Sequence, residues 1–215
     1  MKYDDRYTRL FGIDILDGAM RSGKYGFSTI HATRAKPERL ISFDKAVSCR
    51  DRSQWVHYYI PDPLFSRLAQ NPWRYLPMYQ GYDGAITPDF SVGIRMPLYR
   101  QIQSVGDGRA IGSWLQRCGV DVIPNVRWGL RETYGFCFDG VEPGGTVSVG
   151  TLGCTRDKEL REVFREGVPE MLRRVEPTCV IVYGPLREDI FEPVYEASVE
   201  VLHFNSRTTI VHKAV

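Results

Sequence analysis

Arg127 and Trp128 are neighbouring residues whose types are well suited to bind a ligand. The guanidinium of an arginine is a planar fork of N–H donors that matches a phosphate or carboxylate, and an indole offers a flat face to a base or sugar ring. The pair therefore predicts a nucleotide-like ligand. The same residue types also fit a structural ion pair beside a core tryptophan, and the sequence leaves both interpretations open.

Two acidic residues, Asp89 and Glu132, follow predicted strands. Paired carboxylates serve acid and base catalysis or hold Mg²⁺, so both are candidate catalytic residues and magnesium is a candidate cofactor. An aspartate that follows a proline, as Asp89 does, is also common in turns. Whether the protein is an enzyme stays open at this point.

Further polar residues lie at or just beyond the carboxyl ends of predicted strands, where parallel sheets bind ligands. The remaining predicted ligand-binding residues are Asn125, Thr151, Tyr183 and Asn205. Residues 150–155 run from a strand into a helix, a setting in which exposed amides bind anions, but they lack the lysine of a P-loop. Cys154 in this stretch is a weak candidate nucleophile, because a helix start lowers the pKa of a thiol.

The cysteines and histidines show no spacing typical of a metal site. The five cysteines are odd in number and include no CxxC pair, and the four histidines include no HxxxH or HExxH pair. Such cysteines are typical of reduced thiols in a reducing compartment. We therefore expect no metal site formed by cysteines and histidines, and a zinc site built from Cys137, Cys154 and one histidine is the alternative.

Composition and length predict one ordinary globular protein. The chain has 215 residues, of which 43% are hydrophobic and 25% charged, enough for one large core without a bias towards disorder. Its apolar runs are far shorter than the ~20 residues of a membrane span. We therefore expect a protein that neither carries a signal peptide nor associates with a membrane.

Charge is distributed unevenly along the chain. Residues 19–53 contain eight Lys and Arg against three Asp and Glu, whereas residues 132–200 contain seven against fourteen. A basic first part fits contact with a polyanion such as nucleic acid. Alternatively, the two parts attract each other within the fold or are solvated.

The elements that must position these residues begin after about residue 40. Residues 1–40 have no sustained period and are interpreted as an irregular arm or cap, and residues 41–215 as a single α/β domain. The predicted strands are residues 41–47, 54–60, 84–87, 120–126, 146–149, 179–183 and 199–204, and the longer predicted helices are residues 97–118, 157–175 and 187–197. Gly106 and Gly108 are expected to break the first of these helices.

Strands separated by helical stretches are joined in parallel by right-handed crossovers, so the predicted fold is α/β with a mostly parallel sheet. Polar residues follow nearly every strand and no glycine-rich switch point dominates, which favours a small or incomplete TIM-like barrel. A complete barrel typically needs about 250 residues. An open doubly wound three-layer sheet is the alternative.

Several short motifs follow one another in a specific order between residues 80 and 205. They include Thr87-Pro-Asp-Phe-Ser91, Val122-Ile-Pro-Asn-Val-Arg-Trp-Gly129, Phe136-Cys-Phe-Asp-Gly140 and Ile181-Val-Tyr-Gly184. This order resembles the phage and mobile-element family catalogued as domain of unknown function forty-four-seventeen. The resemblance implies a gene carried by a phage, prophage or plasmid and expressed inside a bacterial cell, so a location in the cytoplasm of the bacterial host is expected. It implies no activity. One departure is Arg95 before Met96-Pro97, where the family has an acidic residue.

Two functional hypotheses follow. The first is an enzyme or binder that acts on a nucleotide, nucleoside or nucleic acid at the carboxyl ends of the strands. The second is a non-catalytic phage accessory protein that binds a host defence or replication factor. Its interface anchors would be aromatic residues of the arm, namely Tyr3, Tyr7, Phe11, Tyr25 and Phe27.

Overall fold

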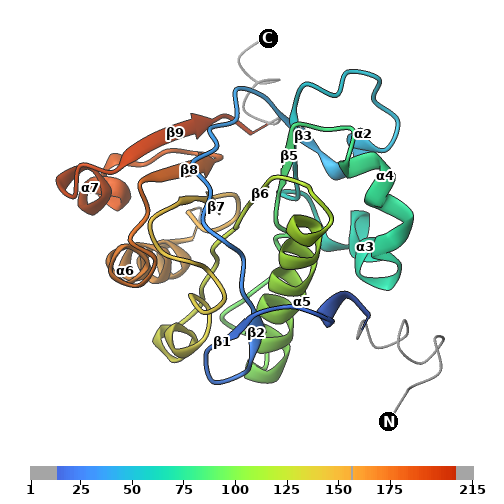
Figure 1. Ribbon diagram of the computed structural model, residues 1–215. Helices are drawn as coiled ribbons and strands as arrows, with labels where there is room; N and C mark the ends of the chain where they lie inside the picture. The colour runs from blue at the N-terminus through green and yellow to red at the C-terminus, as the bar shows by residue number, and fades with distance from the viewer. Residues whose placement is uncertain (1–13, 156, 207–215) are drawn as a thin grey trace.

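Two parallel sheets form the frame of the protein (Figure 1). The computed structural model describes residues 14–155 and 157–206. One sheet has the strand order β3-β4-β5-β6 and the other β7-β8-β9, and all neighbours run parallel. The strands are β3 Leu40–Ser42, β4 Trp55–His57, β5 Gly84–Ile86, β6 Val122–Ile123, β7 Thr146–Gly150, β8 Cys179–Tyr183 and β9 Glu200–Phe204. The predicted α/β fold with a mostly parallel sheet is confirmed.

A parallel backbone bridge joins the two sheets. Asn125, just beyond β6, pairs with Ser148 of β7, and the N–H of Val126 donates to the carbonyl of Ser148 at 2.8 Å. Strand order therefore follows chain order from β3 to β9. A doubly wound sheet reverses its order at a switch point, so this pairing favours the barrel over the alternative. No ladder joins β9 to β3 within the described part of the chain, and the incomplete barrel itself stays a prediction.

The side chains between the two sheets form one apolar cluster. Its members come from β4, β5, β6 and β8 and the segment after β4, and they are Trp55, Tyr59, Ile86, Ile123, Ile181 and Tyr183. Leu40 of β3 and Phe204 of β9 pack against it. Since strands from both sheets share this interior, the sheets face a common centre, as the strands of a barrel do.

Helices follow the strands and cover their outer faces (Figure 1). The long helices are α5 Leu98–Arg117, α6 Lys158–Val175 and α7 Glu188–Glu196. The short ones are α2 Phe43–Ala46, α3 Ser66–Gln70 and α4 Leu76–Tyr79, with 3-10 turns η1 Asp14–Leu16, η2 Asp62–Leu64, η3 Pro72–Tyr75 and η4 Arg131–Gly135. Among the described residues, no helix combines the length and apolar character that crossing a membrane requires.

The predicted break in the helix of residues 97–118 is wrong, because α5 is continuous. The glycines of α5 instead allow neighbouring segments to pack closely against the helix. A Cβ on Gly106 would lie 3.1 Å from the Phe27 ring, and a Cβ on Gly108 would lie 3.1 Å from the Pro88 carbonyl oxygen. Both positions therefore let α5 approach its neighbours closely.

Three predicted strands are shorter than expected. Residues 41–47 give only the end of β3, because Phe43 and Ala46 turn into α2 and are buried there. The stretch 54–60 gives β4 and then two buried tyrosines outside the ladder, and 120–126 gives the two residues of β6. A run of apolar and aromatic residues indicates that a segment is buried. In these three segments, burial extends beyond the residues that pair with a neighbouring strand.

The described part of the predicted arm, residues 14–40, packs against the domain. A small antiparallel hairpin of β1 Arg21–Ser22 and β2 Phe27–Ser28 lies beside α5. Phe27 is buried, and Ile30 is fully buried and forms a bridge with Val141. The domain boundary at residue 40 stays a prediction, and Tyr3, Tyr7 and Phe11 lie outside the described residues.

The guanidinium of Arg109 in α5 ties this helix to two loops. Nε donates to the carbonyl of Asp139, Nη1 to that of Asn125 and Nη2 to that of Cys137, each at 2.9 Å. Burial lowers the pKa of Arg109 to about 10. A buried cation is tolerated when its donors are satisfied, so these three bonds are a requirement of the fold.

We predict that Arg109→Gln lowers the free energy of unfolding by about 3 kcal/mol, because buried carbonyls lose their donors. Arg100→Gln, an exposed position of the same helix, should change it by less than about 0.5 kcal/mol. Urea unfolding followed by circular dichroism measures both. Equal stabilities of the two variants would contradict this role of Arg109.

Candidate ligand-binding site

Asp89 is the centre of a buried hydrogen-bond network beyond the ends of β5 and β6. Its Oδ1 accepts from Nδ2 of Asn125 at 2.8 Å, and its Oδ2 accepts from Nη1 of Arg127 at 2.6 Å. Asp89 is only 8% exposed. Interactions between charges are stronger in such shielded surroundings than in water. The structure therefore brings three of the predicted site residues together in one unit.

Hydrogen bonds of its backbone and side chain hold Asn125 in place, and Asn125 in turn orients the carboxylate of Asp89. Its backbone N–H donates to Oγ1 of Thr87 at 2.8 Å, and its side-chain Oδ1 accepts from the hydroxyl of Tyr59 at 3.0 Å. The Tyr59 hydroxyl also shares a hydrogen bond of 2.5 Å with Oγ of Ser148. Burial, with the nearby charge of Asp89, raises the pKa of Tyr59 well above its usual value, so the hydroxyl stays protonated.

Tyr59 and Ser148 were not among the predicted site residues. Ser148 carried a signal, because it is a polar residue between Val147 and Val149 in an apolar strand. Gly150, at the end of β7, makes room for the network: a Cβ there would lie 2.6 Å from the Tyr59 ring. The network thus depends on side chains and space contributed near the ends of β4, β5, β6 and β7.

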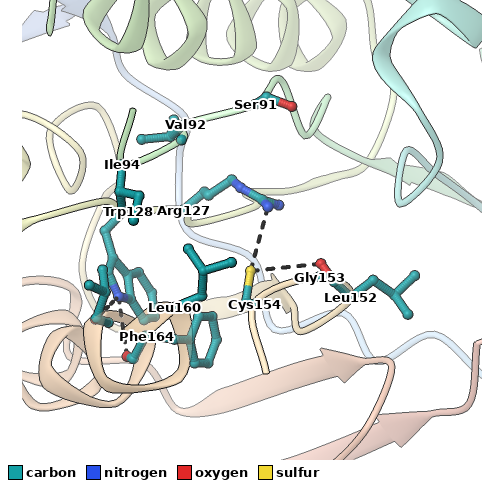
Figure 2. Close-up of a pocket in the computed structure, with 12 residues that line it drawn as sticks. Ser91, Val92, Ile94, Arg127, Trp128, Leu152, Gly153, Cys154, Leu160 and Phe164 are labelled. Atoms are coloured by element: carbon teal, nitrogen blue, oxygen red, sulfur yellow. Dashed lines mark hydrogen bonds between the residues drawn. The ribbon is translucent and has the colours of Figure 1, made fainter. Parts of the chain in front are cut away.

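Arg127 extends from this network to the wall of a cavity of about 210 Å³ (Figure 2). Its side chain is 24% exposed, and Nη2 donates to Sγ of Cys154 at 3.5 Å. The charge of Asp89 raises the pKa of Arg127, so the guanidinium remains protonated. No further acceptor contacts it among the described residues, which leaves Nε–H and one hydrogen on each terminal nitrogen for a ligand.

The other walls of the cavity are mostly apolar. They include Val92, Ile94, Trp128, Leu152, Leu160, Val163 and Phe164. Figure 2 shows Arg127 pointing towards Cys154, with Trp128, Leu160 and Phe164 along the same side. The cavity therefore combines a cationic side chain and a few polar atoms with a hydrophobic surface, which is typical of small-molecule sites.

Trp128 is a core residue that also lines this cavity. Its ring stacks on Phe164 with 4.8 Å between centroids, and its Nε1 donates to the carbonyls of Val163 at 3.3 Å and Phe164 at 3.2 Å. A Cβ on Gly167 of α6 would lie 2.1 Å from this Nε1. Stacking of a ligand on the indole stays a prediction.

The remaining predicted site residues make no hydrogen bond to Asp89, Asn125 or Arg127 in the described part of the chain, although the Tyr183 ring stacks on that of Tyr59. Thr151 is fully buried, and its hydroxyl donates to the carbonyl of Tyr183 at 3.2 Å, a structural contact. Tyr183 and Asn205 line a separate pocket between β3 and β9. Glu132 is exposed on η4, lines no cavity with Arg127, and has no hydrogen bond to Asp89 in the described part of the chain.

The structure therefore gives no support to Asp89 and Glu132 as a carboxylate pair. Within residues 14–155 and 157–206, no group of three His, Cys, Asp or Glu side chains is placed to hold a metal ion. The proposed magnesium site and the alternative zinc site thus have no ligand cluster in this part of the chain.

The expectation that a helix start lowers the pKa of Cys154 is wrong. The helix begins only at Lys158, where Asp157 caps it by accepting the N–H of Glu159 at 2.8 Å. Burial raises the pKa of Cys154, and the nearby charge of Arg127 offsets this only in part. The thiol is therefore protonated at neutral pH, which does not suit a nucleophile.

The family described as "Domain of unknown function (DUF4417)" matches residues 19–205, which contain the whole network. The Gene 1 proteins of Mycobacterium phage D29 and Mycobacterium phage L5 are each 35% identical to this chain over 132 residues, or 61% of it. The match covers 49% of the D29 protein and 58% of the L5 protein, so the chain spans about half the length of these curated relatives. No solved structure matches.

We predict that Gly167→Ala lowers the free energy of unfolding by about 1–3 kcal/mol, because the new methyl group displaces the Trp128 ring. Gly135→Ala is the matched control, since a Cβ there meets nothing within 4 Å. Thermal unfolding and tryptophan fluorescence report both changes. An unchanged midpoint and emission spectrum for Gly167→Ala would show that Trp128 does not need this glycine.

We predict that iodoacetamide modifies Cys154 more slowly than a free cysteine at pH 7.5, because a raised pKa leaves less thiolate at that pH. The rate should rise as the pH passes above the ordinary value for a thiol. Peptide mass spectrometry after timed alkylation separates Cys154 from the other cysteines. Faster modification of Cys154 than of free cysteine at pH 7.5 would restore it as a nucleophile.

Proposed function

The chain belongs to the family described as "Domain of unknown function (DUF4417)", and we propose that this phage-type protein binds a nucleobase or nucleoside in the cavity beside Arg127. The observation that carries the proposal is the ion pair between Asp89 and Arg127. It fixes the guanidinium against an apolar cavity while several of its donors have no protein acceptor among the described residues.

The charge of the pair favours a neutral ligand. Asp89 compensates Arg127 at 2.6 Å, so the two together contribute no net charge to the cavity. A fixed guanidinium recognises two acceptors on one edge of a ring, as arginine does with O6 and N7 of guanine. Apolar walls such as Val92, Leu160 and Phe164 suit the faces of such a ring.

The size of the cavity also points to a ring-sized group. Its volume of about 210 Å³ is smaller than the about 300–1,000 Å³ typical of sites for drug-sized molecules. A nucleobase is therefore the part of the ligand that we place inside, with any sugar outside. This refines the hypothesis of a nucleotide-like ligand.

The chemistry of the site supports binding rather than catalysis. Both carboxylate oxygens of Asp89 accept hydrogen bonds, and the pKa of Cys154 is raised. A general base needs a proton acceptor poised near the operating pH and in reach of the substrate. We therefore propose no catalytic residue.

The basic first part of the chain gives little support to nucleic-acid binding. Lys36 pairs with Glu200 at 2.5 Å, and His31 contacts Glu142 at 3.2 Å. These contacts join the basic first part to the acidic later part, which favours attraction within the fold. We therefore propose a small ligand rather than a polymer.

The alternative, a protein that binds a host defence or replication factor, has one observation in its favour. Tyr25 and Met20 are 42% and 64% exposed near the small hairpin, and exposed apolar side chains serve as interface anchors. Phe27, by contrast, belongs to the core. Removing residues 1–40 would take Phe27 and Ile30 out of the interior, so substitution of Tyr25 and Met20 by serine is the suitable test of this alternative.

We predict that the wild-type protein binds at least one of guanosine, adenosine, cytidine and uridine, and that Arg127→Lys weakens this binding at least tenfold. Lysine keeps a positive charge beside Asp89 but lacks the planar fork. Arg127→Ala is less suitable, because it leaves a buried carboxylate without its partner. Isothermal titration calorimetry measures the affinities.

Arg131→Lys is the matched control, since Arg131 is exposed, pairs with Glu166 and lines no part of the cavity. It should bind as the wild type does. Absence of binding for all four nucleosides, or equal affinity of Arg127→Lys and wild type, would contradict the proposed function.

A further inference from the structure

A second pocket, of about 670 Å³, lies between β3 and β9 at the carboxyl ends of the strands. These are the outer strands of the two sheets, and each pairs on one side only within the described residues. Four residues that end strands line it, namely Ser42, His57, Tyr183 and Phe204. The pocket therefore has the position at which parallel α/β proteins bind ligands.

The lining of this pocket is basic. It contains Lys45, His57 and His203 and no aspartate or glutamate among the described residues. Nearby basic side chains are paired with carboxylates, as Lys36 is with Glu200 and Arg39 with Asp51. The ammonium group of Lys45, by contrast, has neither an ion pair nor a hydrogen bond to any residue that the structure describes, whereas the Lys45 carbonyl accepts from the N–H groups of Ser48 and Cys49. An anion entering the pocket would therefore meet a cation and no opposing carboxylate.

One buried hydroxyl in the wall of the pocket has no hydrogen-bond partner among the described residues. Ser42 is 3% exposed, and its Oγ has no hydrogen bond to any described residue. Buried polar atoms are nearly always hydrogen-bonded, so an unpaired one points to a missing partner. Because Ser42 lines the pocket, a ligand that accepts this hydrogen bond is such a partner.

One side of the pocket is formed by aromatic rings that pack against one another. The Tyr183 ring lies 4.5 Å from that of His57 and 4.8 Å from that of Tyr59, measured between centroids. Nδ1 of His57 accepts the backbone N–H of Tyr59 at 3.2 Å, which fixes the orientation of the imidazole ring beside Tyr183. Tyr183 and Phe204 thus give the pocket an aromatic surface beside its polar groups.

We propose that this pocket binds a small sugar phosphate. Lys45 and the Ser42 hydroxyl would contact the phosphate, and the aromatic surface formed by Tyr183 and Phe204 would contact the sugar. A phosphate monoester carries the negative charge and the acceptor oxygens that these two side chains lack in the described part of the protein. The volume lies in the range of about 300–1,000 Å³ typical of small-molecule sites. This site goes beyond the proposed function, since the Arg127 cavity has a compensated charge and takes a neutral ring.

Titration calorimetry of the full chain with ribose 5-phosphate, ribose and inorganic phosphate tests the proposal. Ribose 5-phosphate should bind at least tenfold more tightly than either of the other two compounds. Lys45→Gln should weaken its binding at least tenfold and Ser42→Ala at least threefold. Lys158→Gln, an exposed lysine at the start of α6, should leave it unchanged.

The stability of Ser42→Ala separates a ligand contact from a structural one. Removing an unpaired buried hydroxyl should leave the thermal midpoint unchanged or raise it, while binding weakens. A lower midpoint would show that the hydroxyl has a structural partner and would overturn its role. Absence of ribose 5-phosphate binding, equal affinity in Lys45→Gln, or equal affinity for ribose or inorganic phosphate would also overturn the proposal. Nucleoside binding at Arg127 is measured separately and does not decide this result.

Discussion

The buried ion pair between Asp89 and Arg127 constrains the junction of the two sheets. Burial of two charges is favourable only when their hydrogen bonds are satisfied, and removing one partner leaves the other charge buried and unpaired. Asn125 meets this requirement for Asp89, and Tyr59 holds Asn125 in turn. The backbone bridge between Asn125 and Ser148 lies at the same place. The network therefore fixes the ends of β4, β5, β6 and β7 relative to one another.

The same network connects the two candidate ligand sites. Arg127 belongs to the network and lines the apolar cavity. Tyr59 also belongs to the network and stacks on Tyr183, which lines the pocket between β3 and β9. One cavity has a charge that Asp89 compensates, and the other has basic residues without a lining carboxylate among the described residues. The two proposals thus assign ligands of different charge to two sites at the carboxyl ends of the strands.

Much of the architecture could be predicted from the sequence. The strand at residues 179–183 and the helices at 157–175 and 187–197 were clear, because long periodic or continuous apolar stretches are compatible with few alternative structures. The rule that ligands bind beyond parallel strands also selected Asp89, Asn125 and Arg127. Tyr59 could not be selected, since its contact with Asn125 depends on how β4 and β6 are aligned across β5.

Other predictions concerned features that a local sequence pattern does not determine. Glu132 follows a strand as Asp89 does, but the loop leads it to the surface on η4. Whether a residue after a strand faces the site depends on the path of the chain, which no local pattern records. The glycines of α5 are a similar case, because glycine is needed both for helix breaks and for close packing.

A double-mutant cycle on Asp89 and Arg127 tests the central claim most directly. Urea unfolding would compare Asp89→Asn, Arg127→Met and the double variant with the wild type. If the pair governs the junction, each single variant loses about 3 kcal/mol and the double variant loses at least about 1.5 kcal/mol less than their sum. Additive losses would show that the two side chains act independently and would contradict the account.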